Sequence, residues 1–91
     1  MTVTVKIPTQ LRAVAGGAAE ARAEGATVAE ALESLYAEHA ELRDRLVGED
    51  GTLRRFVNVY LAGEDIRFLA GLDTPVPDGA ELTILPAVAG G

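Results

Sequence analysis

The amino-acid sequence predicts an α+β fold, in which a mixed sheet of about five strands is covered by one main helix plus a short helical segment. Three features predict it. Segments near both ends of the chain alternate apolar and polar residues, the period of a strand with one buried face. A middle segment repeats apolar residues every three or four positions, as a helix does. No second long helical repeat follows, and 91 residues leave room for one core only.

The N-terminal part predicts a β-hairpin. In residues 2–7, β-branched apolar residues alternate with polar ones and would face the core: Val3, Val5 and Ile7. Pro8 ends this strand, and Gly16-Gly17 is typical of a turn. Residues 18–24 alternate alanine with charged side chains, which predicts the returning strand although alanine is a weak strand former.

The main helix is predicted to begin after Thr27. Thr27 and Glu30 have the capping-box spacing, which satisfies free N–H groups at a helix start. Apolar residues then fall on one helical stripe: Val28, Ala31, Leu32 and Leu35. Leu42 and Leu46 extend the helical character over residues 39–47, and a loop follows at 48–51.

The second half predicts three further strands. Residues 56–62 form the strongest, with Val57, Val59 and Leu61 on one face and Phe56, Asn58 and Tyr60 on the other. A turn at 63–65 leads to a short returning strand at 66–68. Asp78-Gly79 is a second turn, before a final strand that carries Leu82 and Ile84 and is stopped by Pro86.

The resulting order, β-β-α-β-β-β, is that of a β-grasp fold. A ferredoxin-like fold would need a second helix after the third strand. Residues 63–78 do not have the pattern of a long helix, so the β-grasp arrangement is favoured.

Composition narrows the function classes. The chain has no cysteine, one histidine and a formal net charge of −6. Disulfides and thiolate metal sites are excluded, and an acidic domain repels phosphate backbones, so we expect no nucleic-acid partner. We assign His39 a structural role near a helix end and the adjacent Glu64 and Asp65 a solvated turn, with no metal site. This inventory is poor for an enzyme.

Nothing in the sequence directs the protein to a membrane. It has no apolar run of the roughly 20 residues that span a bilayer, and no signal-peptide pattern. We therefore expect a cytoplasmic protein.

The C-terminal residues form the candidate site. We divide the chain into a domain, 1–85, and a tail, 86–91, with the sequence Pro86, Ala87, Val88, Ala89, Gly90 and Gly91. Six extended residues reach about 20 Å, far enough to bring the terminal carboxylate into another protein's active site. Gly90 would provide clearance and Gly91 the reacting carboxylate, while the residues before them would make extended main-chain contacts in a partner's channel. The alternative is an ordinary frayed terminus.

A carboxylate reacts with nucleophiles only after activation, for instance as an acyl-adenylate. Attack by a sulfur donor would then leave a thiocarboxylate. Beside the tail, outward-facing residues would form a docking patch for the partner: Tyr60, Asn58, Leu85 and Phe68. The alternative places Phe68 in the core and makes Tyr60 an ordinary surface residue.

Several segments resemble the ubiquitin-like sulfur carriers, the ThiS and MoaD group. The similarity covers most of the chain: residues 73–91, 56–60, 64–68, 3–9 and 11–12. It is strongest to the branch that serves actinobacterial cysteine biosynthesis. The resemblance implies a protein co-substrate that binds no cofactor itself. A ubiquitin-activating-type adenylating enzyme (MoeB-, MoeZ- or ThiF-like), using ATP and Mg²⁺, would activate Gly91.

The same resemblance implies two further partners. A sulfurtransferase would supply sulfur, and an acceptor enzyme would receive it, either a PLP-dependent cysteine synthase or a thiosugar synthase. Three other functions stay open: a protein modifier joined to lysines, the small subunit of molybdopterin synthase, and a β-grasp interaction module whose terminus has no role.

Overall fold

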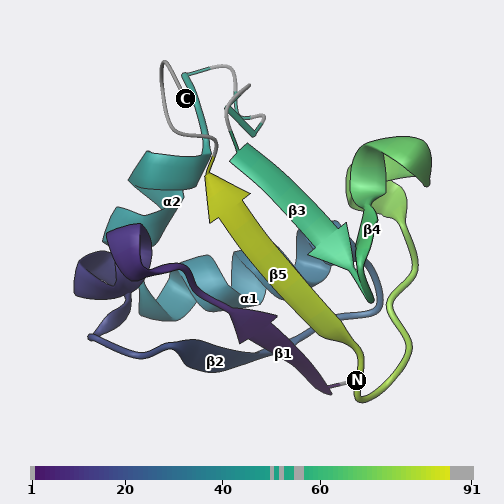
Figure 1. Ribbon diagram of the computed structural model, residues 1–91, viewed down its shortest axis with the longest axis horizontal. Helices are drawn as coiled ribbons and strands as arrows, with labels where there is room; N and C mark the ends of the chain where they lie inside the picture. The colour runs from purple at the N-terminus through teal and green to yellow at the C-terminus, as the bar shows by residue number, and fades with distance from the viewer. Residues whose placement is uncertain (1, 50, 52, 55–56, 87–91) are drawn as a thin grey trace.

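The computed structural model describes residues 2–49, 51, 53–54 and 57–86 (Figure 1). Five strands form one sheet in the order β2-β1-β5-β3-β4. Their bounds are β1 Thr2–Lys6, β2 Glu20–Glu24, β3 Val57–Leu61, β4 Glu64–Asp65 and β5 Glu81–Pro86. β1 and β5 are parallel, and the other neighbouring pairs are antiparallel. The predicted mixed sheet is confirmed.

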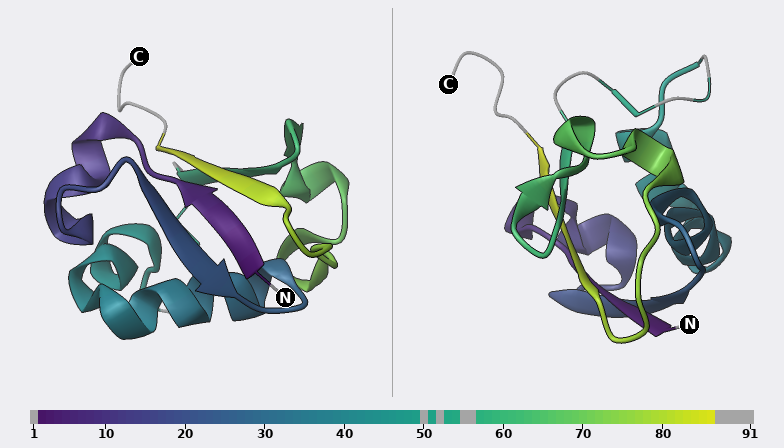
Figure 2. Two further views of the ribbon diagram at one scale, coloured as in Figure 1. Left: turned by 90° about the horizontal axis from the view of Figure 1, so that it is seen from below. Right: turned by 90° about the vertical axis from the view of Figure 1, so that its right-hand side faces the viewer.

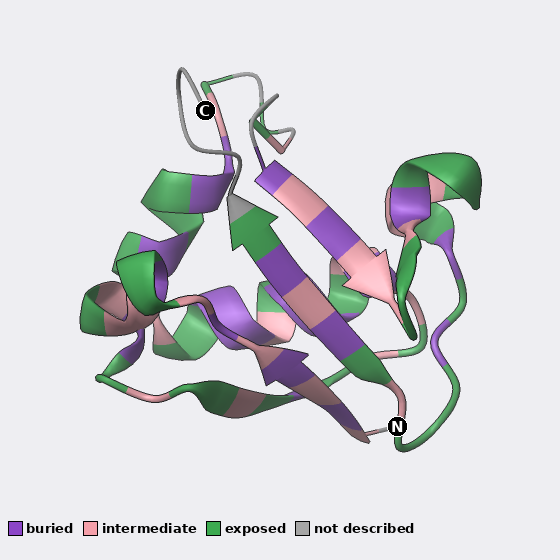
Figure 3. Cartoon of the chain, in the orientation of Figure 1, coloured by how far each residue is buried: buried purple, intermediate pink, exposed green. Residues whose placement is uncertain are grey.

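Two α-helices cover one face of this sheet and leave the other face open (Figure 2). They are α1, Val28–Glu38, and α2, Ala40–Leu46. β1, β3 and β5 alternate buried residues with half-buried or exposed ones, because only one face of the sheet meets the helices (Figure 3). The core between the layers is almost entirely aliphatic, and its largest fully buried side chains are Ile7, Leu32, Leu35, Leu42, Leu46, Leu82 and Ile84.

The predicted capping box begins α1. The N–H of Glu30 donates to Thr27 Oγ1 at 3.2 Å, and the N–H of Ala26 donates to Glu30 Oε1 at 2.9 Å. All four members of the predicted apolar stripe are buried. The helix ends at His39, whose N–H donates to the carbonyl of Leu35 at 3.0 Å, and α2 begins at the next residue. The short helical segment is therefore confirmed as a separate helix.

The N-terminal hairpin forms as predicted, with Val5 opposite Ala21, but its connection is not a simple turn. A 3-10 helix, η1, spans Thr9–Ala15 and buries Leu11 and Ala15 under α2. Gly16 ends it with a left-handed φ of 69°. Two buried residues four positions apart, without a side-chain cap, are too weak a pattern to predict this helix.

The prediction of a strand at residues 66–68 is wrong. These residues form a second 3-10 helix, η2 (Ile66–Phe68), and the strand before it, β4, has only two residues. The carboxylate of Asp65 accepts a hydrogen bond from the N–H of Arg67 at 2.9 Å, which caps the 3-10 turn and ends strand pairing. A third 3-10 helix, η3, spans Gly71–Asp73.

The end of the final strand also differs from the prediction. Pro86, expected to begin the tail, is the last residue of β5 and pairs with Val57. Phe56, which was expected to begin the third strand, lies outside the described residues, as does the rest of the predicted tail, residues 87–91.

Candidate functional site

The central strand of the sheet leads directly to the C-terminal tail. β5 is hydrogen-bonded to β1 on one side and to β3 on the other. Leu82 and Ile84 anchor it, because their side chains are completely buried under the helices. The tip of β5 lies beside the start of β3 (Figure 1). Residues 87–91 therefore follow one of the most firmly held segments of the fold.

Three of the predicted docking residues lie together on the open face. Asn58 of β3 is directly opposite Leu85 of β5, and Tyr60 is opposite Thr83. Directly opposite residues in an antiparallel pair project from the same face. Leu85 is 46% exposed, and Asn58 and Tyr60 are half-buried. Asn58, Tyr60 and Leu85 form what we call the β3–β5 patch, and it adjoins the exit of the tail.

Phe68 lies elsewhere. It belongs to η2, which follows the edge strand β4, and β3 and β4 separate it from β5 in the sheet order (Figure 1). Its side chain is 86% exposed, so the alternative that placed it in the core is wrong. Leu69 beside it is 41% exposed, and the two make a second exposed apolar surface at this edge of the sheet.

A groove that the sequence did not predict lies on the other side of the tail exit. It has a volume of about 200 Å³ and is bounded by the end of β1, the start of η1 and the end of β5. Pro8, Arg12 and Leu85 are among the residues that line it. Arg12 is held in place because its Nε donates to the carbonyl of Ile7 at 3.2 Å. Only the parallel pairing of β1 with β5 brings these distant residues together.

The charged residues of the open face include one cluster. Lys6 Nζ lies 3.0 Å from Glu20 Oε2 and 3.9 Å from Glu81 Oε2, on the strands that flank β1. The hydrogen bond to Glu20, followed by the negative charges of Glu20 and Glu81, raises the pKa of Lys6. The ammonium form is thus held in place beside β5.

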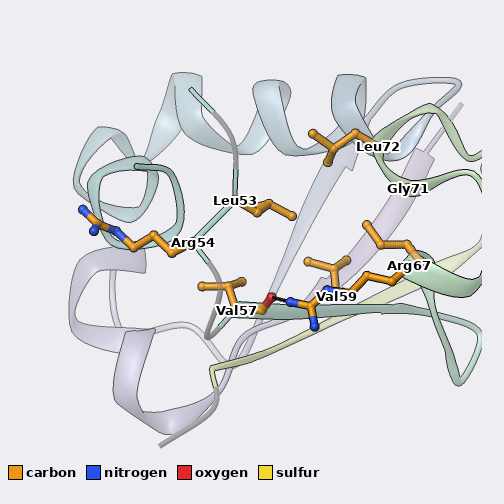
Figure 4. Close-up of a pocket in the computed structure, with 8 residues that line it drawn as sticks. Leu53, Arg54, Val57, Val59, Arg67, Gly71 and Leu72 are labelled. Carbon is orange, nitrogen blue, oxygen red and sulfur yellow. Dashed lines mark hydrogen bonds between the residues drawn. The ribbon is translucent and has the colours of Figure 1, made fainter. Parts of the chain in front are cut away.

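A larger hollow lies on the buried side of the sheet, where Val57 and Val59 project (Figure 4). It has a volume of about 430 Å³, and aliphatic side chains such as Val57 and Val59 line it together with Arg54 and Arg67. The guanidinium of Arg67 donates to the carbonyl of Val57 at 2.9 Å. Because Val57 and Val59 point away from the open face, this hollow does not contribute to the patch.

In the described part of the chain, no group of three or more His, Asp or Glu side chains is arranged to hold a metal ion. None of the helices in these ranges has the length and apolar character needed to cross a bilayer.

Known proteins are similar to this chain both in sequence and in fold. The profile of the ThiS family matches residues 5–91. The sulfur carrier protein CysO of Mycobacterium tuberculosis is 46% identical over 93 residues, and the alignment covers 100% of both chains. Small archaeal modifier protein 3 of Haloferax volcanii is 41% identical over 68 residues, which cover 75% of this chain and 73% of that protein.

A solved structure adds the three-dimensional comparison. A chain in the crystal structure of the BexX/CysO complex of Amycolatopsis orientalis superimposes with a TM-score of 0.89 and is 53% identical. The superposition covers 98% of this chain and 99% of that one. The ubiquitin-like β-grasp fold expected from the order of the elements is therefore shown by sequence and by structure.

Proposed function

We propose that this chain, which belongs to the ThiS family and is a sulfur carrier protein, carries sulfur as a thiocarboxylate on its last residue, Gly91. The observation that carries the proposal is the family match through Gly91, in a chain whose Gly90-Gly91 end follows the central strand. Gly90 supplies clearance in a partner's active site because it has no Cβ. After Pro86, which ends β5, the three residues Ala87, Val88 and Ala89 make extended contacts in the channel that leads there.

The chemistry takes two steps, both on a partner enzyme. In the first, an oxygen of the Gly91 carboxylate attacks the α-phosphate of ATP, and pyrophosphate leaves. In the second, hydrosulfide supplied through a sulfurtransferase attacks the acyl carbon, the bond to the phosphate oxygen breaks, and AMP leaves. The product is the thiocarboxylate. ATP and Mg²⁺ belong to the adenylating enzyme, of the MoeB, MoeZ or ThiF type, and this chain contributes the carboxylate and the docking surface.

The β3–β5 patch docks on that adenylating enzyme. An exposed leucine beside a half-buried tyrosine offers an apolar centre, and the groove at Arg12 extends it on the other side of the tail exit. A chain similar to this one is found in a complex with a second protein, BexX, which supports a role exerted through protein partners. The loaded tail then delivers sulfur to an acceptor enzyme, a cysteine synthase or a thiosugar synthase.

The similarity to small archaeal modifier protein 3 favours a second candidate function. An activated carboxyl group that accepts sulfur also accepts the amine of a lysine, which would join this chain to other proteins. Covalent adducts on lysate proteins, dependent on Gly91 and ATP, would distinguish this function from sulfur transfer.

The proposal predicts a specific mass change. Intact mass is measured after incubation with an adenylating enzyme, ATP and a sulfide source. We expect the wild-type chain to gain the difference between one sulfur and one oxygen. A chain that lacks Gly91, and a chain with one alanine appended, should both keep their original mass and their thermal stability. Loading of either altered chain at the wild-type rate would overturn the proposal.

A further inference from the structure

The only lysine of the chain stands close to the tail exit. Lys6 lies on the open face of β1 and is the register partner of Thr83 on β5. From Thr83 to Pro86 the strand advances three residues, about 10 Å, and neighbouring strands are about 4.8 Å apart. The backbone of Lys6 is therefore roughly 11 Å from the point where β5 ends.

The tail is long enough to return to this lysine. Five residues follow Pro86. Their extended length is at most about 18 Å, to which the lysine side chain adds its own reach. Tethered groups of this kind meet at effective concentrations on the order of millimolar. An activated carboxyl group at Gly91 thus has a lysine amine of its own chain within range.

That proximity would be harmful during activation. A neutral amine attacks an acyl-adenylate to form an amide: the C–N bond forms, the bond from carbon to the phosphate oxygen breaks, AMP leaves, and the nitrogen releases a proton to water. The product is a ring closed on the same chain, or a dimer linked to a second one. Either product consumes the carboxylate that should receive sulfur. Only the neutral amine can attack, because an ammonium has no free electron pair.

We propose that Glu20 and Glu81 hold Lys6 in ion pairs, which restrain its side chain and further reduce the small fraction of neutral amine, and that this protects the activated tail against capture by the chain's own lysine. Glu20 reaches Lys6 from β2 on one side, and Glu81 reaches it from β5 on the other. Glu20 and Glu81 are thus positioning residues for sulfur loading, since they act through Lys6. The raised pKa of Lys6, caused first by the hydrogen bond to Glu20, agrees with this arrangement. The inference rests on the proposed activation of Gly91.

The test compares two variants of equal charge. Glu20→Gln with Glu81→Gln removes both ion-pair partners, while Glu24→Gln with Glu41→Gln removes two carboxylates that no ion pair joins to Lys6. Each chain is incubated with an adenylating enzyme and ATP, first without a sulfur source and then with sulfide. Products are analysed by intact mass and by peptide mapping.

Without sulfide, we expect the first variant to form amide several-fold faster than wild type, as a monomer or dimer that has lost one water. Peptide mapping should place the link between Gly91 and Lys6, and adding Lys6→Arg should abolish it. The matched control should behave as wild type. An equal amide yield in the two variants, with normal thiocarboxylate formation in sulfide, would overturn the inference and leave the carrier function intact. Absence of thiocarboxylate in every chain would overturn the proposed function, and the inference with it.

Discussion

Tyr36 buries a hydroxyl group without a hydrogen-bond partner among the described residues. Only 7% of the residue is exposed, and its hydroxyl oxygen is fully buried. A small hollow of about 40 Å³ lies beside it, bounded in part by Glu33 and Leu72. Burial, followed by the negative charge of Glu33, raises the pKa of Tyr36 to about 12. The fold therefore tolerates this phenol in its neutral form.

Replacing Tyr36 with phenylalanine should leave stability at neutral pH unchanged or raise it by about 1 kcal/mol, because an unsatisfied hydroxyl is removed. The pH dependence follows from the sign of the shift. The pKa of Tyr36 rises from 10.0 to about 12 on folding. The titration of Tyr36 therefore leaves the free energy of unfolding at its full value below pH 10. It lowers that free energy as pH rises towards 12, because the phenol ionises more readily in the unfolded chain. The variant should lose less stability in this window.

Urea unfolding at neutral and alkaline pH measures both effects. A variant more than about 1 kcal/mol less stable than wild type at neutral pH would show that the hydroxyl does have a partner, such as a water in the adjacent hollow.

Gly25 is required by a close backbone approach. A Cβ at this position would stand 2.5 Å from the backbone nitrogen of Ala31 and 2.7 Å from the carbonyl carbon of Glu30. Backbone atoms of a capped helix cannot move aside as a flexible side chain can. The end of β2 therefore passes against the first turn of α1 only because residue 25 has no side chain.

We expect Gly25→Ala to lower the free energy of unfolding by about 1–3 kcal/mol, as overpacking does. The control is Gly17→Ala, where a Cβ would meet no atom within 4 Å and only a left-handed φ of 81° is strained. Thermal unfolding of the two variants is compared. If Gly25→Ala lowers the free energy of unfolding no more than Gly17→Ala does, the close backbone approach is not the reason for a glycine at position 25.

At the scale of elements, the position of β5 decides what surrounds the tail. Because β5 lies between β1 and β3, its last residues pair with β3 on one side and adjoin the segment that follows β1 on the other. One neighbour supplies Asn58 and Tyr60, and the other leads to Pro8 and Arg12. An edge strand would offer only half of this surface.

Leu85→Asp should weaken binding to the adenylating enzyme by about 1–2 kcal/mol or more, because it places a charge at the centre of the β3–β5 patch. Phe68→Asp is the matched comparison, since Phe68 is more exposed but belongs to η2 at the sheet edge. It should bind as wild type does. Calorimetric titration gives both affinities, and a loss only at Phe68 would move the docking surface to that edge.

At the scale of the whole molecule, charge sets the conditions for association. A formal charge of −6 on 91 residues favours partners with a basic surface and steers their encounter. We expect the association rate with the adenylating enzyme to fall several-fold when ionic strength is raised to about 0.15 M, with a smaller change in the dissociation rate. Stopped-flow mixing over a salt series measures both. A rate independent of salt would exclude electrostatic steering.

Strong periodic patterns mark the elements that were predicted correctly from the sequence. The alternation of Val3 and Val5, and the stripe from Val28 to Leu35, each bury one face, and the burial confirms them. The 3-10 helices were missed or mistaken because short turns have no such period. At η2, a side-chain cap from Asp65 outweighed the strand propensity of Ile66 and Phe68.

The sequence by itself determined the order of the longer strands and the α-helices, the apolar core and the Gly90-Gly91 end, because periodicity and composition are properties of neighbouring residues. Only the tertiary structure decided that Leu85 lies beside Asn58 but apart from Phe68, and that Lys6 lies between Glu20 and Glu81. These contacts depend on strand register and on the parallel pairing of β1 with β5. Pairing between strands far apart in the chain is set by the packing of the whole sheet against its helices, which no local pattern encodes.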